Sequence, residues 1–304
     1  MRRRRIAKAP PPWTEDPIIA NYRFCNVRRE DDAVTVWVRR NIREPFADHP
    51  DLWLMLCIAR QVNWPDTLAE LIAEGAWPKD GFDAGKLEEA IGARIARGEK
   101  TWTGAYVIAA GSTPGVPKHR HIVRNVLAPL WGARDEFRGI LASRDKYLQA
   151  VHRLLTRHDG WGPFMAYQAV VDMRFTKLLD DAVDIRQWAA AGPGTLRGLN
   201  RLRGRATDAR ISQAQALSEI REIDGFVREA TGVDMDFSDI PNILCETDKY
   251  IRVAKREGEP RAKYVAREGA SVPGVDDVES AAAPHSDPVA KRDPYDAVFS
   301  TYFR

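Results

Sequence analysis

Apolar positions along this chain recur with the spacing of helices. Between residues 18 and 265, apolar side chains return every three or four positions, and strict alternation of apolar and polar residues is scarce. This pattern predicts helices over about 33–42, 52–62, 66–72, 83–97, 123–155 and 212–230. The apolar stretch 101–110 could be a strand or a helix. We therefore predict a mainly α-helical fold.

The two ends differ in composition from this helical part. Residues 1–17 are basic and rich in proline, and could be either a disordered leader or an arm that contacts phosphate. From about Glu268 the chain turns to Ser, Pro, Ala, Gly and Asp, a composition that cannot build a core. We predict a flexible basic arm over 1–17, one helical domain over 18–266 and a flexible tail over 267–304.

Composition limits the cellular compartments and the metal or disulfide chemistry that are expected for this chain. The chain of 304 residues contains no run of about 18 apolar residues, and its basic start lacks the apolar segment of a signal peptide. Its three cysteines are widely separated, which suits a reducing compartment and argues against a disulfide framework or a cysteine-based zinc site. The six histidines form no metal pair at helical spacing. We expect a soluble cytoplasmic protein with no metal and no cofactor.

The charge is unevenly distributed along the chain. The net charge is only +3, yet arginine dominates around 23–43, 120–157 and 197–210. Acidic residues concentrate near 219–248 and in the tail. Local basic surfaces on a chain of moderate net charge suit a DNA-binding enzyme better than a histone-like packaging protein.

A hairpin of two helices is predicted around residues 147–178. An apolar helix ends at the turn Gly160-Trp161-Gly162, and Pro163 suits the first position of the next helix. Free amides at that helix N-terminus can bind a phosphate, as in a helix-hairpin-helix. The other interpretation is an ordinary corner between two helices. The candidate DNA-binding residues of the hairpin are Gly160, Trp161, Gly162, Phe164 and Tyr167.

Two aspartates follow the hairpin and are candidates for catalysis. Asp172 lies near the end of the second hairpin helix, and Asp184 follows Gly162 by 22 residues. Helix-hairpin-helix DNA glycosylases resemble this layout, since their catalytic aspartate comes about 20 residues beyond the hairpin. Alternatively, these aspartates cap helices or pair with Arg174 and Arg186.

Glycine and arginine alternate in a third motif, Gly192-Pro193-Gly194-x-x-Arg197-Gly198-Leu199. Glycine amides and an arginine could together hold a phosphate. The motif is not a Walker A loop, and neither is the stretch that ends Gly98-Glu99-Lys100-Thr101, so kinase chemistry is not expected in this chain.

Two further clusters mix aromatic and charged residues. In the segment 21–30, aromatic residues alternate with arginines, as expected of a surface that stacks bases and binds phosphates, or of a solvated face beside a packed Phe24. In the segment 244–250, Glu246 and Lys249 could form a helical ion pair.

Six motifs occur in this order along the chain: Tyr22-Arg23-x-x-Asn26-x-x-Arg29-Glu30, Arg60-x-x-Asn63-Trp64-Pro65, Gly160-x-Gly162-x-Phe164-Met165-Ala166-Tyr167, Asp172-x-Arg174, Gly192-Pro193-Gly194-x-x-Arg197-Gly198-Leu199 and Leu244-Cys245-Glu246-x-Asp248-Lys249-Tyr250. Together they resemble the motifs of the phage-type alpha-glutamyl/putrescinyl thymine pyrophosphorylase family. That family includes amino acid:DNA transferases and shares a helical domain with 5-hydroxymethyluracil DNA kinases. The resemblance covers about residues 18–265.

The resemblance implies a helix-hairpin-helix, DNA-glycosylase-like helical fold that serves thymine hypermodification in bacteriophage DNA, within the bacterial host during infection. The implied enzyme is a transferase that flips activated 5-hydroxymethyluracil out of double-stranded DNA and replaces its phosphate or pyrophosphate with an amine, such as an amino acid. A separate 5-hydroxymethyluracil DNA kinase would be a further partner. The chain shows no nucleotide-binding domain of a kinase, which favours the transferase.

The implied roles fall into three groups. Asp172 or Asp184 would accept a proton from the amine, Arg197 would stabilise the leaving phosphate, and Gln168 would read the uracil edge. Trp161 or Tyr167 would stack on the base, and Arg201 would join the hairpin on DNA. The substrate and phosphate ligands would be Arg23, Asn26, Arg28, Arg29, Arg60, Asn63, Gly192, Gly194, Gly198 and Lys249.

Two other functions remain compatible with the sequence. A true glycosylase would use the aspartate to stabilise cleavage at the sugar and would leave abasic sites. A non-catalytic DNA-binding module that partners a kinase would bind DNA whether or not the aspartates are present.

Overall fold

The computed structural model of the chain describes residues 10, 13–104, 108, 114–260 and 263–264. Within these residues the regular elements are all helices, and a single isolated β-bridge joins Tyr22 to Lys263. The prediction of a mainly helical fold is confirmed. Of the stretch 101–110, residues 101–104 form neither strand nor helix, and most of the remainder lies outside the described residues. The predicted tail over 267–304 and most of the predicted arm also lie outside them.

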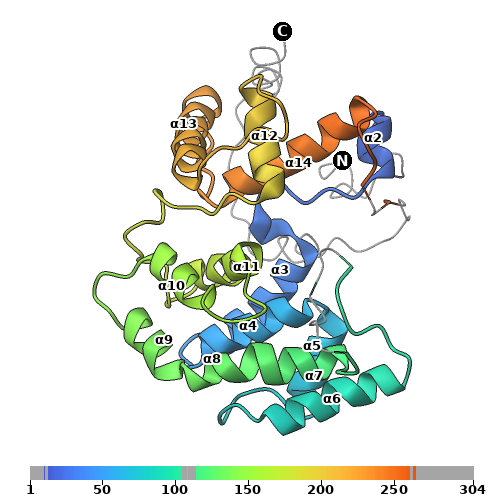
Figure 1. Cartoon of the computed structure of the whole chain (residues 1–304), viewed down its shortest axis with the longest axis vertical. Coiled ribbons are helices and arrows are strands. Elements are labelled where there is room, and N and C mark those ends of the chain that lie inside the picture. The colour runs from blue at the N-terminus through green and yellow to red at the C-terminus, as the bar shows by residue number, and fades with distance from the viewer. Residues whose placement is uncertain (1–9, 11–12, 105–107, 109–113, 261–262, 265–304) are drawn as a thin grey trace. The chain divides into compact units, whose positions relative to one another are not determined.

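The chain divides into two compact units, and α3 (Ala33–Val38) crosses their boundary (Figure 1). Unit 1 comprises residues 1–36 and 189–304, and unit 2 comprises residues 37–188. The range predicted as one helical domain therefore holds parts of two units. The described helices of unit 1 are α2 (Pro17–Asn21), η1 (Arg29–Asp31), α12 (Pro193–Leu202), α13 (Gln213–Thr231) and α14 (Asp239–Ala254). Those of unit 2 are η2 (Arg39–Arg43), α4 (Leu52–Val62), α5 (Pro65–Ala73), α6 (Ala84–Ala96), α7 (Lys118–His121), η3 (Ile122–Leu127), α8 (Ala128–Gly132), α9 (Arg134–Leu141), α10 (Leu148–Leu155) and α11 (Pro163–Arg174).

Helix α4 forms the centre of unit 2. Its eleven residues are all buried, because the sequence is apolar around nearly the whole helix, and it packs against α11. The Trp53 ring stacks on the Phe137 ring of α9, with 4.3 Å between centroids. The helix ends at Asn63, which adopts the left-handed conformation with φ 47°. The bounds predicted for this helix, 52–62, are confirmed.

The long helical pattern over 123–155 forms several short helices instead of one. The elements η3, α8 and α9 follow one another closely, and residues 142–147 separate α9 from α10. Pro129 stands in the first turn of α8, where its missing N–H does least harm and where it prevents a continuous ladder of hydrogen bonds. The apolar spacing was read correctly, but the chain turns at positions that the spacing alone does not mark.

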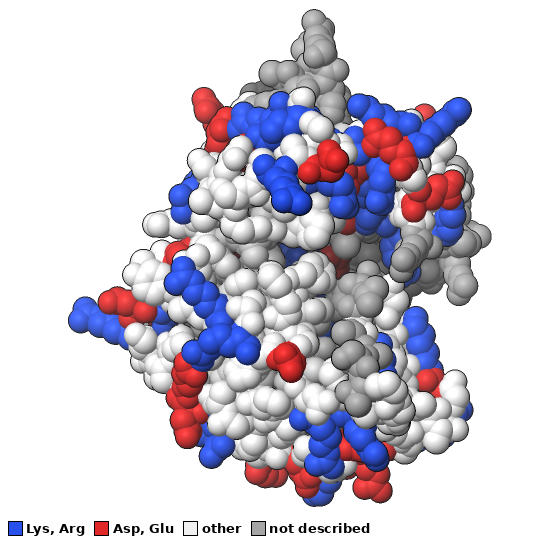
Figure 2. Space-filling view, in the orientation of Figure 1, with Lys and Arg blue, Asp and Glu red and all other residues white. Residues whose placement is uncertain are grey.

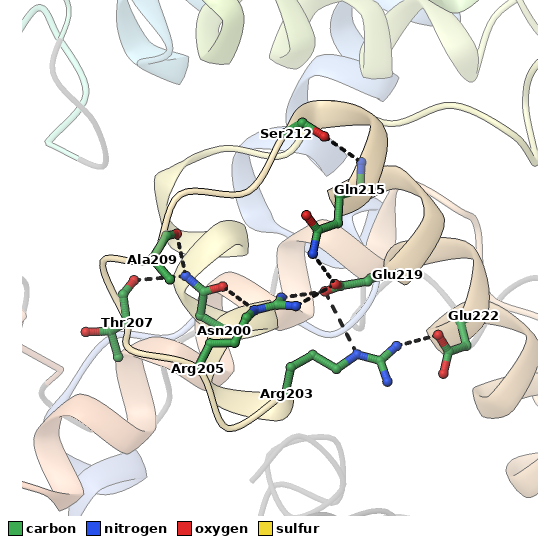
Figure 3. A network of polar contacts seen from close by, with 9 residues as sticks. All are labelled: Asn200, Arg203, Arg205, Thr207, Ala209, Ser212, Gln215, Glu219 and Glu222. Carbon is green, nitrogen blue, oxygen red and sulfur yellow. Dashed lines mark hydrogen bonds and ion pairs between the residues drawn. The ribbon is translucent and has the colours of Figure 1, made fainter.

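In unit 1, α12 and α14 pack against each other, and α13 contacts both. The segment between α12 and α13 is held by a network of polar contacts (Figure 3). The buried Asn200 side chain donates to the carbonyl oxygens of Thr207 and Ala209, at 3.3 and 2.9 Å. Arg205 donates to Asn200 Oδ1 at 2.8 Å and to both carboxylate oxygens of Glu219 at 2.7 Å. This network fixes the C-terminal end of α12 onto α13.

None of the helices in the described part of the chain is long and apolar enough to cross a membrane.

Candidate functional site

The hairpin of unit 2 is formed by α10, a turn over residues 156–162 and α11, and the two helices pack together. Its two glycines have different surroundings. Gly160 has φ 76°, and a Cβ there would lie 2.5 Å from Cγ2 of Val126, so both the backbone conformation and the space require glycine. Gly162 is the N-cap of α11, and a Cβ there would have open space around it. Gly162 is therefore where another molecule could approach the hairpin.

The aromatic side chains of the hairpin differ in exposure. Trp161 is 1% exposed, and its indole N–H points to the Val126 carbonyl at 3.4 Å. Tyr167 is buried and meets the Trp188 ring edge-on. Phe164, in the first turn of α11, is 45% exposed. Of these three rings Phe164 is the one that is open to solvent, whereas the predicted stacking by Trp161 or Tyr167 would require the ring to leave the core.

Asp172 belongs to a buried polar cluster in unit 2. Arg60 of α4 donates to both of its carboxylate oxygens, at 2.5 and 2.6 Å, and also to Asn63 Oδ1 at 3.2 Å. Side-chain exposure is 6% for Arg60 and 1% for Asp172. Burial, and after it the charge of Asp172, raise the pKa of the neighbouring Cys57 thiol. Residues from two separate predicted motifs, Arg60 with Asn63 and Asp172, therefore come together as one charge pair with its amide neighbour.

Asp184 and Gln168 are also buried in unit 2. The two oxygens of Asp184 accept the backbone N–H groups of Leu148 and Gln149, at 2.7 and 3.0 Å. These amides lie in the first turn of α10, so Asp184 acts as a remote cap that satisfies two unpaired helix donors. Gln168 lies within α11 and is 7% exposed. Asp172 and Asp184 thus have different partners, and each is held by both of its oxygens.

The glycines of the Gly192–Gly198 motif lie at the crossing of α12 and α14. A Cβ on Gly198 would overlap the Leu244 carbonyl oxygen and lie 2.9 Å from its carbon. A Cβ on Gly194 would overlap Cys245 Sγ. Gly192 is the N-cap of α12. Gly194 and Gly198, four residues apart on one helix face, let the two helix backbones approach closely.

Arg197 and Arg201 share one carboxylate. Asp248, whose side chain is 1% exposed, accepts Arg197 Nε at 2.8 Å and Arg201 Nε at 2.9 Å. Arg201 is 8% exposed and also pairs with Glu257, whereas Arg197 is 38% exposed. Burial raises the pKa of the Cys245 thiol; Glu246 adds to this effect, and the charges of Lys249 and Arg197 oppose it. Arg197 and Lys249 therefore both lie near Cys245.

The segment 21–30 runs against α14. Cys25 N–H donates to Glu246, and Asn242 donates to the Asn26 carbonyl at 3.0 Å. Lys249 pairs with Glu246 at 2.5 Å and donates to the Arg23 carbonyl at 3.4 Å. The helical ion pair expected in the segment 244–250 is therefore present. The side chains of Arg23 and Arg28 are exposed.

Arg29 connects the same segment to the start of α14. Its backbone N–H donates to Asp239 Oδ1 at 2.8 Å. Burial raises the pKa of Asp239 to about 6; Asp236 adds to the rise, and the Arg29 amide with the charges of Arg29 and Arg28 opposes it. Asp239 is thus a carboxyl group whose pKa of about 6 lies close to neutrality, at the first residue of α14.

We expect Asp239→Asn to flatten the pH dependence of stability between pH 4 and 7. The folded pKa of about 6 exceeds the ordinary value of 3.8, so the group favours folding below pH 4 and loses this contribution as pH rises through 6. The amide oxygen of Asn can still accept the Arg29 N–H. Over this range the native chain should lose about 3 kcal/mol relative to the variant. Urea unfolding at several pH values measures the difference, and parallel profiles for the two proteins would contradict it.

The six motifs sort into two groups in the structure. The Arg60, Gly160 and Asp172 motifs lie in unit 2, where Gln61 also donates to the Gly160 carbonyl at 3.2 Å. The motifs at residues 22–30, 192–199 and 244–250 lie together in unit 1. Asp248 and Asp239 were not among the predicted site residues. Asp248 stood within a recognised motif, but its buried pairing with two arginines has no local signal.

Figure 2 shows Lys and Arg interspersed with Asp and Glu over unit 1. No group of three side chains suited to metal binding occurs in the described ranges.

Comparison with known proteins identifies the family. Residues 1–259 match the family described as "5-hmdU DNA kinase, helical domain". Among curated proteins, the 5-hmdU DNA kinase of Bacillus phage SP10 is 26% identical over 217 residues, which is 65% of this chain and 33% of that protein. The chain thus spans about a third of the length of the relative it matches. No solved structure matches it. Because the match covers most of the sequence, the chain belongs to the family of the 5-hmdU DNA kinase helical domain.

Proposed function

We propose that this protein is a phage enzyme of thymine hypermodification that acts on 5-hydroxymethyluracil in DNA. The observation that carries the substrate is the match to the helical domain of 5-hmdU DNA kinases over residues 1–259. The hairpin of α10 and α11, with an open Gly162 and an exposed Phe164, supports contact with DNA. The proposed fold relationship is to helix-hairpin-helix DNA glycosylases.

The proposed reaction is transfer of an amine to an activated base. The amine nitrogen forms a bond to the exocyclic methylene carbon of the base while the carbon–oxygen bond to phosphate or pyrophosphate breaks. The leaving group departs with the bonding electron pair, and the amine loses a proton to a base, which is Asp172 or Asp184 in this proposal. Cationic side chains stabilise the leaving group.

A second function is a DNA-binding module that works with a separate kinase. The observation in its favour is that both carboxylates are already engaged, Asp172 by Arg60 and Asp184 by the first amides of α10. An incoming amine would therefore have to reach a remaining lone pair of an oxygen that already accepts a hydrogen bond. The module would bind modified DNA without changing it.

Mass spectrometry of nucleosides distinguishes these functions. DNA that carries phosphorylated or pyrophosphorylated 5-hydroxymethyluracil is incubated with the full chain and candidate amines. A base heavier by the amine, in intact strands, is the expected product. Abasic sites would instead show a glycosylase, and unchanged nucleosides with tight binding would favour the module.

We expect Gly162→Asp to weaken DNA binding without unfolding the protein. Aspartate is a good N-cap residue, and the added side chain meets open space, so the fold should persist. Its negative charge would stand where a backbone phosphate approaches, which should lower affinity about tenfold at low salt. Fluorescence anisotropy with labelled duplex DNA measures the change.

Gly162→Asn is the matched control, because it has the same size and capping ability without the charge. Its affinity should stay near that of the native protein. Equal affinities for the Asp and Asn variants would remove the hairpin from the DNA interface.

A further inference from the structure

One guanidinium of unit 1 is fixed in direction while its outer edge stays open. Arg197 donates through Nε to Asp248 at 2.8 Å, and this is the only hydrogen bond that its side chain makes within the described residues. Its two terminal nitrogens keep their N–H donors available, and the side chain is 38% exposed. A guanidinium held through Nε presents a planar pair of donors, which is the geometry that binds a phosphate oxygen pair.

The neighbouring cations of unit 1 use more of their donors in ion pairs than Arg197 does. Arg201 divides its donors between Asp248 and Glu257 and is 8% exposed. Lys249 is paired with Glu246 through both carboxylate oxygens. Formal charges within this group balance, so an anion would be recognised there by the direction of the Arg197 donors and not by excess charge alone.

The glycines of the same motif do not compete for this role. Gly194 and Gly198 face α14 at the helix crossing, and their Cα positions are covered by Cys245 and Leu244. Their close approach brings α12 against α14, and this sets Arg197 beside the buried Asp248. The residues of the motif therefore have two separate roles: its glycines let the two helices pack closely, and its arginine remains available at the surface.

We propose that the outer edge of Arg197 is an anion-binding site for a phosphate or pyrophosphate group, and that Asp248 is the positioning residue that holds it. The site itself stands on this geometry; its identification with the leaving group of the base rests on the proposed function. Asp248 acts through Arg197, because a buried carboxylate that accepts Nε prevents the guanidinium from rotating. The ligand is a tetrahedral oxyanion that accepts two parallel N–H bonds.

Isothermal titration of the full chain with inorganic pyrophosphate at low ionic strength tests the site. We expect the native chain to bind, and Arg197→Gln to bind at least about tenfold more weakly, since charge-assisted hydrogen bonds are lost. Arg197→Lys keeps the charge but cannot donate to Asp248 and offer a planar pair together, so it should also lose most of the affinity. Arg210→Gln removes an exposed arginine elsewhere in unit 1 and should stay within about twofold of the native chain.

Asp248→Asn tests the positioning role. It keeps the shape of the side chain but removes the charge, so pyrophosphate affinity should fall towards that of Arg197→Gln. In the Arg197→Gln background the same change should have little further effect, because its target is absent. A merely structural Asp248 would instead lower affinity equally in both backgrounds, and thermal melting of each variant verifies that it is folded.

Three results would overturn the proposal: no pyrophosphate binding by the native chain, Arg197→Gln within about twofold of native affinity, or Arg197→Lys equal to native. These outcomes are separate from those for the function. Pyrophosphate binding that depends on Arg197, without any modified base, would leave the site standing and reject the transferase. A modified base formed equally well by Arg197→Gln would keep the transferase and reject Arg197 as the ligand of its leaving group.

Discussion

Replacing Asp172 with Asn is expected to lower the free energy of unfolding by about 3–5 kcal/mol, because it leaves the Arg60 guanidinium buried without its counter-charge. Arg60 donates to both oxygens of Asp172, and both side chains are almost fully buried. The amide of Asn can accept one of these bonds but cannot balance the charge. Urea unfolding followed by circular dichroism measures the loss.

The double variant Arg60→Met, Asp172→Leu separates stability from catalysis. Replacing a buried ion pair by apolar residues of similar volume is often neutral or stabilising, so this variant should recover most of the stability lost by Asp172→Asn. If Asp172 is the base of the proposed reaction, the folded double variant should still form product about two to four orders of magnitude more slowly. Native turnover in a folded double variant would make Asp172 structural, and failure to recover stability would mean that the pair has a further role in the fold.

Asp184 is the second candidate for the base, and its partners differ from those of Asp172. Its two oxygens accept the N–H groups of two backbone amides of α10. Product formation by Asp184→Asn is therefore measured in the same way, at a temperature where the variant is folded. Retained turnover in both carboxylate variants would mean that neither aspartate is the base, and that another group accepts the proton of the amine.

Local features of the fold were predictable from the sequence because they depend on nearby residues. The helix over 52–62 has a continuous apolar composition and a stop signal in Asn63-Trp64-Pro65, and its bounds were predicted correctly. Pro163 was expected at the first position of a helix, and α11 begins there. Ser212 caps α13, where a helix over 212–230 was expected.

The partners of the candidate residues could not be predicted in the same way. Arg60 and Asp172 are separated by 112 positions, and Asp184 lies 36 positions from the amide that it caps. Hydrophobic periodicity reports which face of a helix is buried but not which distant side chain meets it. The sequence pattern singled out Arg60, Asp172 and Arg197, and the three-dimensional fold decided how they pair.

The sequence of the Gly192–Gly198 motif is compatible with two different structural roles. Glycines beside an arginine suit a phosphate loop, but glycines four residues apart on a helix also suit close packing. Phosphate binding by the glycine amides of this motif stays a prediction. The spacing of Gly194 and Gly198 was a signal for the helix crossing that could have been used.

Gly198→Ala should therefore destabilise unit 1 strongly. The added Cβ would overlap the backbone of Leu244, which cannot rotate away as a flexible side chain can, so α12 and α14 must move apart. We expect a loss of about 3 kcal/mol in the free energy of unfolding. Separation of the two helices should also lower the fraction of molecules in which Arg197 contacts Asp248.

Gly225→Ala is the matched control for this prediction. Gly225 lies within α13, and a Cβ there meets no atom within 4 Å. Alanine is the better helix former, so this variant should gain about 0.5–1 kcal/mol in stability. Urea denaturation of both variants, with pyrophosphate titration of the folded protein, gives the comparison. If Gly198→Ala is as stable as Gly225→Ala, the two helices do not require the close approach, and the placement of Arg197 beside Asp248 would need another cause.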